Sequence, residues 1–267
     1  MPYPLIDIGA NLAHDSFDDD RAEMMQRAAD AGVVAMIVTG SSDDSNRRAA
    51  ELAAAHPGVL YSTAGVHPHH ASDYDDASDD RIRSLAQQPC VVAVGECGLD
   101  YFRNFSPREA QLDAFRRQLG IARDTGLPVF LHQRDAHDDF VEILEPALEG
   151  ISRAVAHCFT GEGESLREYL AMGLYIGVTG WICDERRGRH LHDIVGIIPD
   201  DRLLIETDAP YLLPRTIRPR PKTRRNEPMY LTEVLKTLAE ARGQSEEHVA
   251  RITTENARRF FNLPVCE

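Results

Sequence analysis

The sequence predicts a (β/α)8 barrel, and three observations lead to this fold class. Short apolar runs rich in Val, Ile and Leu alternate with longer amphipathic segments from one end of the chain to the other. Eight such runs occur, and a length of 267 residues is close to the ~250 residues typical of one barrel of this kind. Strands that are buried on both faces and separated by helices form parallel sheets, so eight such units predict closure into a barrel. An open, doubly wound sheet is the structural alternative.

The predicted strands are the contiguous apolar runs. Short runs of this kind, bounded by polar or glycine-containing segments, are typical of strands that are buried on both faces. The eight predicted strands are residues 5–8, 33–38, 60–66, 91–94, 129–131, 154–156, 175–178 and 203–205.

The predicted helices lie between the strands, where apolar residues recur at intervals of three and four. Gly32, Gly126 and Gly173 each follow a predicted helix and precede a strand, which is the position of a left-handed helix cap. After the eighth strand, an irregular stretch at 209–228 leads to two further helical segments. The helices predicted between strands are 21–31, 46–55, 109–125, 140–148 and 164–172.

Composition predicts one globular domain over residues 1–267. Hydrophobic residues make up 43% of the chain and charged residues 27%, so the chain can form a large core. No run of about 18 apolar residues occurs, and the N-terminus lacks the basic and apolar regions of an export signal, so we expect no membrane association. The five cysteines, of which Cys266 is the last, are widely spaced and include no C-x-x-C pair, which favours a reducing compartment. We expect a monomeric, cytoplasmic protein.

Acidic and histidine residues follow the ends of four predicted strands. Glu96, His132, His157 and Asp208 follow the fourth, fifth, sixth and eighth strands. In a barrel, active sites lie at the C-terminal ends of the strands. Carboxylates brought together there repel one another and lose hydration, and a bound divalent cation resolves both problems. The sequence therefore predicts a metal centre with these four residues as ligands.

The ligand types leave the metal open, because imidazole with carboxylate suits Zn²⁺, Mn²⁺ or Fe²⁺, whereas carboxylates with waters suit Mg²⁺. A bound metal lowers the pKa of a water molecule and offsets charge on the attacked oxygen, so the predicted chemistry is hydrolysis. Asp208 and Glu96 are the candidate catalytic residues, with Asp208 as the group that accepts the water proton. Glu206 either supports a ligand or forms a buried salt bridge.

A net charge of −14 argues against nucleic acid as a partner unless basic residues are concentrated locally. Residues 215–225 contain six Arg or Lys and no acid, and nearby prolines predict an extended loop on the same rim as Asp208. Such a loop favours an anionic substrate, although a solvated surface run is the alternative. The candidate nucleic-acid-binding residues are Arg134, Arg186, Arg187, Arg224 and Arg225. The candidate stacking partners for single-stranded bases are Tyr101, Phe102, Trp181 and Tyr211.

Seven motifs, taken together and in this order, resemble those of the TatD family of metal-dependent deoxyribonucleases. The resemblance covers essentially the whole chain. The motifs are GVHPH at 65–69, GECGLD at 95–100, PVFLHQRDAH at 128–137, HCFTG at 157–161, GVTGWICDERRG at 177–188, ETDAPYLLP at 206–214 and RRNEP at 224–228.

The resemblance implies a TIM barrel of the metal-dependent hydrolase superfamily. It implies an exonuclease that acts on single-stranded DNA in the 3′ to 5′ direction, with some activity on RNA. It also implies Mg²⁺ as the metal, with Mn²⁺ or Zn²⁺ as alternatives, and it carries the family's ligand positions onto Glu96, His132, His157 and Asp208. A link to DNA repair or nucleic-acid turnover comes only from the family.

One segment departs from the wider family, in which D-x-H-x-H after the first strand supplies two histidines to a second metal. This chain reads Asp7-Ile8-Gly9-Ala10-Asn11. Gly9 has no side-chain ligand and Asn11 offers only a carbonyl oxygen, so we expect one firmly held cation and a second that is recruited weakly. The residues predicted to bind that second ion or the substrate are Asp7, Asn11 and His67.

Two other functions fit parts of the pattern. The same barrel and metal also serve hydrolases of small amides or lactones, but the six basic residues after the eighth strand favour a polyanionic substrate. A binding protein with a degenerate site would fit the missing histidines of the first strand. Retention of the four other ligands argues against that reading.

Overall fold

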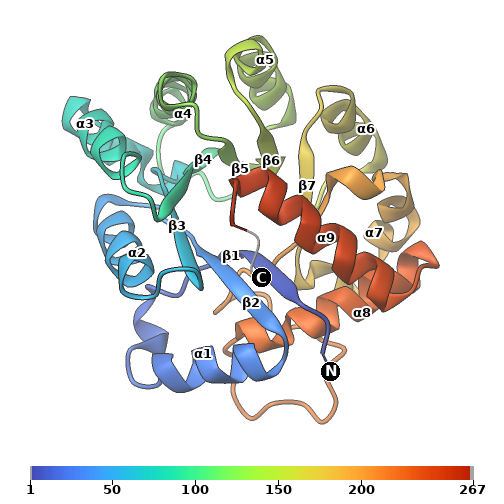
Figure 1. Ribbon diagram of the computed structural model, residues 1–267. Coiled ribbons are helices and arrows are strands. Elements are labelled where there is room, and N and C mark those ends of the chain that lie inside the picture. Colours follow the sequence, from blue (N-terminus) through green and yellow to red (C-terminus); the bar gives the residue numbers. More distant parts are fainter. Residues whose placement is uncertain (1, 265–267) are drawn as a thin grey trace. The chain divides into compact units, whose positions relative to one another are not determined.

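The computed structural model describes residues 2–264, in which strands and helices alternate along the chain (Figure 1). The strands form one sheet in sequential order from β1 to β8. The pairs β3–β4, β4–β5, β5–β6 and β7–β8 are parallel, as the alternation with helices predicts. The strands are β1 (Leu5–Ala10), β2 (Val33–Val38), β3 (Leu60–Ala64), β4 (Val91–Asp100), β5 (Val129–Arg134), β6 (Ala154–Ala156), β7 (Tyr175–Val178) and β8 (Leu203–Ile205).

Four strands, β2, β6, β7 and β8, have the predicted bounds residue for residue. Two others, β4 and β5, are longer than predicted because they continue through polar residues as far as Asp100 and Arg134. In addition, β1 extends to Ala10, and β3 ends at Ala64, two residues early. Contiguous apolar residues therefore mark the buried middle of a strand better than its ends.

The helices follow the predicted alternation, with two additions, α3 and α7. The glycines predicted to cap three helices have positive φ angles, 95° at Gly32, 73° at Gly126 and 81° at Gly173, which confirms the left-handed conformation. The helices are α1 (Arg21–Asp30), α2 (Asp43–Ala55), α3 (Asp76–Leu85), α4 (Arg108–Thr125), α5 (His137–Ala147), α6 (Gly163–Ala171), α7 (Arg189–Ile194), α8 (Leu231–Arg242) and α9 (Glu246–Phe261).

Side-chain caps explain where sequence periodicity misplaced or missed a helix. Ser42 and Ser45 form a capping box, so α2 begins at Asp43, three residues before the predicted start. A second capping box, between Asp75 and Ser78, begins α3. Because α3 is rich in charged residues, its apolar periodicity is too weak to reveal it.

Contacts within the described chain define two compact units. Unit 1 comprises the residues up to Ile37, Cys158–Ala171 and the residues from Tyr175 onward. Unit 2 comprises Val38–His157 and Met172–Leu174. A single domain over residues 1–267 stays a prediction.

In unit 1 the first and last strands of the sheet are neighbours. The amide of Asp208 donates to the carbonyl oxygen of Gly9 at 2.8 Å, and the amide of Asn11 donates to that of Ala209 at 2.7 Å. Together with the sequential strand order, this pairing gives the closed connectivity of a (β/α)8 barrel and confirms the predicted fold class.

The C-terminal helix α9 packs at the other end of β1 and β8, still within unit 1. Thr254 Oγ1 donates to the carbonyl of Pro4, just before β1, at 2.8 Å. Asn256 Nδ2 donates to the carbonyl of Leu203, the first residue of β8, at 2.9 Å. This helix therefore packs against the N-terminal ends of both strands. Residues at this end of a barrel contribute to stability rather than to catalysis.

In unit 2 the pairing of β4 with β5 is interrupted at Glu96. The residues on either side, Gly95 and Cys97, pair with consecutive residues of β5, so Glu96 is the extra residue of a β-bulge. Gly98 follows with a φ of 140°, and a side chain there would collide with the carbonyl oxygen of His132. Glycine at this position therefore permits the close approach of the two strands.

None of the helices in residues 2–264 is long and apolar enough to cross a membrane. The four cysteines within this part of the chain, Cys90, Cys97, Cys158 and Cys183, are free thiols. Cys266 lies outside the described residues.

Candidate metal centre

Three histidines of unit 2 converge on one carboxylate oxygen, Oε1 of Glu96. His157 Nε2 lies 2.8 Å from this oxygen, His132 Nδ1 lies 3.1 Å from it and His67 Nε2 lies 3.4 Å from it. Glu96, His67 and His157 are buried, and His132 is slightly more exposed. One acid and three imidazoles in the interior of a unit form the candidate metal centre.

Four successive strands supply these side chains. The bulge in β4 places Glu96, His132 lies within β5, and His157 directly follows β6. His67 follows β3 and caps the short 3₁₀ helix η2 (Pro68–Asp73). Each residue therefore belongs to the C-terminal half of its strand or to the residues just beyond it, which is the functional end of such a barrel.

The geometry of the cluster fits a divalent cation. Ligand atoms of His67, Glu96 and His132 all lie within 4.8 Å of one another. Two ligand atoms that are each about 2.1 Å from one cation are roughly 3.0–3.4 Å apart in octahedral or tetrahedral geometry. The 2.8 and 3.1 Å separations of His157 and His132 from Glu96 Oε1 lie close to that range.

Electrostatics favour an ionised carboxylate at the centre. Burial raises the pKa of Glu96, but the neighbouring imidazoles of His157, His67 and His132 outweigh burial and hold that pKa well below its ordinary value. Burial, with a smaller contribution from the neighbouring imidazoles, outweighs the attraction of Glu96 and holds the pKa of His67 well below its ordinary value. The centre is therefore an anionic carboxylate among imidazoles, a donor set that attracts a cation.

Asp100, at the end of β4, is hydrogen-bonded to His69 and faces the ring of His132. Its Oδ2 accepts a hydrogen bond from His69 Nε2 at 2.8 Å and lies 3.4 Å from His132 Nε2, with no hydrogen bond to that buried nitrogen in the described chain. Its Oδ1 accepts from the amide of Arg103 at 2.8 Å. Burial raises the pKa of Asp100, but the imidazoles of His132 and His69 outweigh burial and lower it. An ionised carboxylate can accept hydrogen bonds but cannot donate them, so Asp100 favours the imidazole tautomers that carry a proton on the facing Nε2 atoms of His69 and His132.

Asp208 belongs to unit 1 and has its own local support there. It adopts a positive φ of 56°, which is uncommon for residues other than glycine but more accessible to aspartate than to most. Asn11 Nδ2 donates to Asp208 Oδ1 at 3.0 Å. The amide of Asn11 therefore contacts Asp208, and binding of a second ion or the substrate by Asn11 stays a prediction.

Asp7, the other first-strand residue predicted to bind a second ion, is committed to hydrogen bonds within unit 1. Its Oδ1 accepts from the amides of Gly9 at 3.2 Å and Thr207 at 3.0 Å, and its Oδ2 accepts from the Thr207 hydroxyl at 2.5 Å. The side chain is fully buried. These hydrogen bonds engage both oxygens and join β1 to the residues that follow β8. Binding of a second ion or the substrate by Asp7 stays a prediction.

Glu206, in unit 1, is a buried acid that contacts the backbone of Cys158. Its Oε1 accepts from the amide of Cys158 at 2.5 Å, and the side chain is fully buried. Cys158 directly follows His157 in the chain and has a positive φ of 47°. Of the two roles considered for Glu206, this contact favours support of a ligand, since it fixes the backbone next to His157.

The predicted nucleic-acid-binding residues differ in their surroundings. In unit 2 the guanidinium of Arg134 lies 3.9 Å above the ring of Phe102, which is 55% exposed. In unit 1 Arg186 is exposed, and Arg187 lies over Trp181 while pairing with Asp184 at 3.2 Å. Arg134 and Phe102 therefore form a flat, cationic surface that is accessible to a substrate.

Arg224 and Arg225 are adjacent in the chain but have different environments. Arg224 is exposed. Arg225 is one-fifth exposed and makes ion pairs with Asp20 at 2.7 Å and Glu227 at 2.8 Å. The predicted role of Arg225 in binding nucleic acid does not agree with these contacts, because its guanidinium already has two carboxylate partners.

Sequence reasoning named no role for Asp100 or Phe105. Asp100 belongs to the GECGLD motif, and its spacing of four residues from Glu96 along one strand was the signal available. Phe105 is 68% exposed, and its ring lies 4.7 Å from that of His69. Nothing in the sequence distinguishes Phe105 from other loop aromatics.

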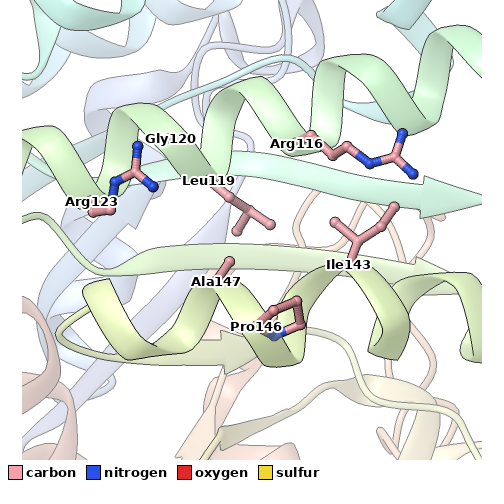
Figure 2. A pocket seen from close by; sticks show the side chains of 7 residues that line it. All are labelled: Arg116, Leu119, Gly120, Arg123, Ile143, Pro146 and Ala147. Atoms are coloured by element: carbon pink, nitrogen blue, oxygen red, sulfur yellow. The ribbon is translucent and has the colours of Figure 1, made fainter.

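A groove between α4 and α5 in unit 2 is a separate feature of the outer surface (Figure 2). It encloses about 300 Å³. Two arginines border it, and its floor is apolar, with no acid or histidine among the residues that line it. It therefore lacks the groups for hydrolysis and is not the candidate site. Its lining residues are Arg116, Leu119, Gly120, Arg123, Ile143, Pro146 and Ala147.

Residues 6–262 match the sequence profile of a family described as "TatD related DNase". The chain is 51% identical over 259 residues to a Pectobacterium carotovorum protein named "3'-5' ssDNA/RNA exonuclease TatD", covering 97% of this chain and 100% of that protein. It is similar to the same degree, with the same coverage, to an Erwinia tasmaniensis protein of that name.

Two solved structures share the fold over nearly their full length. A hydrolase of the TatD family from Entamoeba histolytica superposes with a TM-score of 0.88 at 26% identity, covering 98% of this chain and 99% of that one. A TatD homologue from Escherichia coli gives a TM-score of 0.88 at 30% identity, with 97% and 98% coverage. Both support the assignment of the barrel fold.

Proposed function

The chain belongs to the family of TatD-related DNases, and from this premise we propose that it is a metal-dependent nuclease that removes nucleotides from the 3′ end of single-stranded DNA and RNA. The observation that carries the proposal is the convergence of His132 and His157 on Glu96. Imidazoles around an ionised carboxylate are suited to a hydrolytic metal.

Glu96, His132 and His157 hold the cation in this proposal. A divalent cation, when bound, lowers the pKa of a water molecule and offsets negative charge on the phosphate under attack. The Glu96 carboxylate balances the charge of the ion, and its burial keeps competing solvent away. Asp100 fixes the orientation of His132 from the opposite side of the ring.

Asp208 takes the role predicted from its place after β8, as fourth ligand and as acceptor of the water proton. The hydrogen bond from Asn11 supports this role, since it orients the carboxylate at its Oδ1. Asp208→Asn tests it, because an amide cannot accept the proton of the attacking water.

Mg²⁺ is the metal in this proposal, following the family resemblance. The donor set also suits Mn²⁺ and Zn²⁺, because imidazole is a softer ligand than the oxygens that Mg²⁺ prefers. Turnover measured with each ion at the same free concentration distinguishes them.

Single-stranded nucleic acid is the substrate class that the exposed basic and aromatic side chains favour. Arg134 over Phe102 offers one charge for a phosphate and one flat surface for a base. Arg186 and Arg224 add exposed positive charge in unit 1. A strand whose bases are unpaired can use both kinds of contact, whereas a duplex hides its base faces.

The cellular setting in this proposal is the cytoplasm, where the protein acts as a monomer. Free thiols at Cys90, Cys97, Cys158 and Cys183 are consistent with a reducing compartment. A role in DNA repair or nucleic-acid turnover rests on the family resemblance alone.

The decisive experiment is a time course on one single-stranded DNA oligonucleotide labelled at either end, with Mg²⁺, with Mn²⁺ and with chelator. Removal of nucleotides from the 3′ end gives a ladder of shortening products from the 5′-labelled strand, and early release of a labelled mononucleotide from the 3′-labelled strand. The reverse pattern would indicate the opposite polarity. No cleavage with any metal would reject the nuclease and favour the hydrolase of small amides or lactones.

Variants connect the activity to the candidate site. Glu96→Gln removes a negative ligand of the same size, so we expect turnover to fall at least about a hundredfold, in line with a metal contribution of several kcal/mol. Glu142→Gln makes the same change on the exposed surface of α5 and serves as the matched control. Equal activity of both variants would exclude Glu96 from the site.

A further inference from the structure

His67 is held by a hydrogen bond that decides which of its nitrogens carries a proton. It caps η2, and its Nδ1 accepts the backbone N–H of His69 at 3.1 Å. A backbone N–H is always a donor, so Nδ1 must present its lone pair. A neutral imidazole has one ring proton, and in His67 this proton is therefore on Nε2.

This assignment removes both nitrogens of His67 from metal binding. A metal requires a nitrogen lone pair, but Nδ1 gives its lone pair to His69 and Nε2 carries the proton. A doubly protonated ring would also be unable to bind a metal, and it would lose the hydrogen bond to His69. His67 lies among atoms that are close enough together to hold an ion, yet its protonation pattern excludes it as a ligand.

His132 has the opposite arrangement. Its Nε2 faces the Asp100 carboxylate at 3.4 Å, and an acceptor on that side keeps the ring proton there. Its Nδ1 then presents a lone pair on the side of Glu96, 3.1 Å from Oε1. Two histidines beside the same carboxylate oxygen therefore differ in kind: His132 offers a lone pair, and His67 offers an N–H.

The Nε2–H group of His67 has only a long contact with an acceptor, Glu96. The distance from His67 Nε2 to Glu96 Oε1 is 3.4 Å, which is longer than the ordinary hydrogen-bond distance of about 2.9 Å. An N–H donor beside a cation site meets an anionic oxygen when a phosphate is bound there. Such donors contribute most in a site from which water is excluded, and His67 is buried.

We propose that His67 is a substrate-binding residue whose Nε2–H donates a hydrogen bond to a non-bridging oxygen of the phosphodiester, and that it is not a metal ligand. This inference rests on the proposed nuclease function. The sequence left two roles open for His67, binding a second ion or binding the substrate, and this inference selects the substrate.

The test compares His67→Asn with the wild-type protein. Asparagine is a good helix cap, so it can still accept the amide of His69, but its side chain is too short to present a donor beside Glu96. Thermal unfolding checks that the variant is folded. His132→Ala serves as the control that removes a ligand.

The first measurement is calorimetric titration with Mn²⁺ alone. We expect His67→Asn to keep the wild-type stoichiometry and an affinity within about twofold, and His132→Ala to lose at least about tenfold in affinity. A loss of Mn²⁺ affinity or of a binding equivalent in folded His67→Asn would overturn the inference, because it would make His67 a ligand.

The second measurement is binding of deoxythymidine 5′-monophosphate to the Mn²⁺-loaded proteins. Loss of one charge-assisted hydrogen bond weakens binding by about tenfold or more, so we expect that increase in Kd for His67→Asn. An unchanged Kd would overturn the inference. Because this measurement needs no turnover, it judges the role of His67 even if the wild-type protein fails to cleave DNA, which would reject the proposed function separately.

Discussion

Arg225 and Asp20, which are 205 residues apart in the chain, form a bidentate pair in which Nη1 and Nη2 donate to Oδ1 and Oδ2, each at 2.7 Å. The same guanidinium pairs with Glu227 at 2.8 Å, and it lies 4.9 Å from the centre of the Phe17 ring. Its hydrogen bonds are the main reason that the pKa of Asp20 falls to about 2. Arg225 therefore joins the start of α1 to the segment before α8.

This network predicts that two adjacent arginines have different functions. Arg225→Ala breaks a partly buried bidentate pair, so we expect the free energy of unfolding to fall by about 1–3 kcal/mol, with little direct effect on substrate contacts. Arg224→Ala should leave stability unchanged, weaken binding of single-stranded DNA and reduce the salt slope of binding by about one. Urea unfolding and binding anisotropy across a salt series measure the two effects. Equal stability of both variants would contradict the assignment.

A second prediction concerns Arg134, whose guanidinium stacks on the exposed ring of Phe102. Arg134→Gln removes one positive charge, so we expect weaker binding of single-stranded DNA and a salt slope smaller by about one. Arg116→Gln removes the same charge from the exposed surface of α4, beside the α4–α5 groove, and is the control. A loss of affinity that is the same for both variants would show that only net charge matters.

A third prediction concerns the support of His132 by Asp100. Asp100→Asn keeps the size of the side chain but removes the negative acceptor that faces Nε2, so the proton of His132 can move to Nδ1 and compete with a metal. We expect the affinity for Mn²⁺ to fall about 10- to 100-fold, as for other residues that orient metal-binding histidines. Asp113→Asn, on the exposed surface of α4, is the control. Calorimetry measures both, and wild-type affinity in Asp100→Asn would remove the residue from this role.

The sequence alone predicted the alternation of strands and helices because most strand residues are buried, so most strands contain a short, largely apolar run. The same pattern placed Glu96, His132 and His157 near the C-terminal ends of their strands, although β4 and β5 continue beyond Glu96 and His132. Contacts between distant residues did not follow. The bulge at Glu96 depends on the register with β5, and the partner of Arg225 depends on folding that brings Asp20 to it.

The contacts of Asp7 show the same limit. Asp7 stands at the first position of the family's D-x-H-x-H pattern, and only the structure reveals that its carboxylate accepts hydrogen bonds from Thr207, 200 residues away. The identity of one residue in a sequence motif does not reveal which hydrogen bonds its side chain makes in the folded protein. The difference between a ligand and a structural acid therefore required the three-dimensional contacts.

A fourth prediction follows from Asp7, whose pKa is raised by burial to about 7 from an ordinary value of 3.8, despite its hydrogen bonds from Thr207 and Gly9. Because the folded pKa is higher than the unfolded one, its contribution to stability is complete below about pH 4 and is lost as the pH rises through 7. Asp7→Asn resembles the protonated acid and cannot ionise. Its amide can donate to the Thr207 hydroxyl, while its oxygen still accepts from the two amides.

We therefore expect the stability of the wild-type protein to fall relative to that of Asp7→Asn between pH 4 and 7, by at most about 1.4 kcal/mol for each pH unit. The two proteins should be most alike near pH 4, and the variant should be the more stable at pH 8. Urea unfolding at several pH values, with chelator present so that metal binding does not contribute, measures the difference. A difference that is constant across this range would mean that Asp7 is ionised in the folded protein, and its hydrogen bonds with Thr207 would then outweigh the cost of burying its charge.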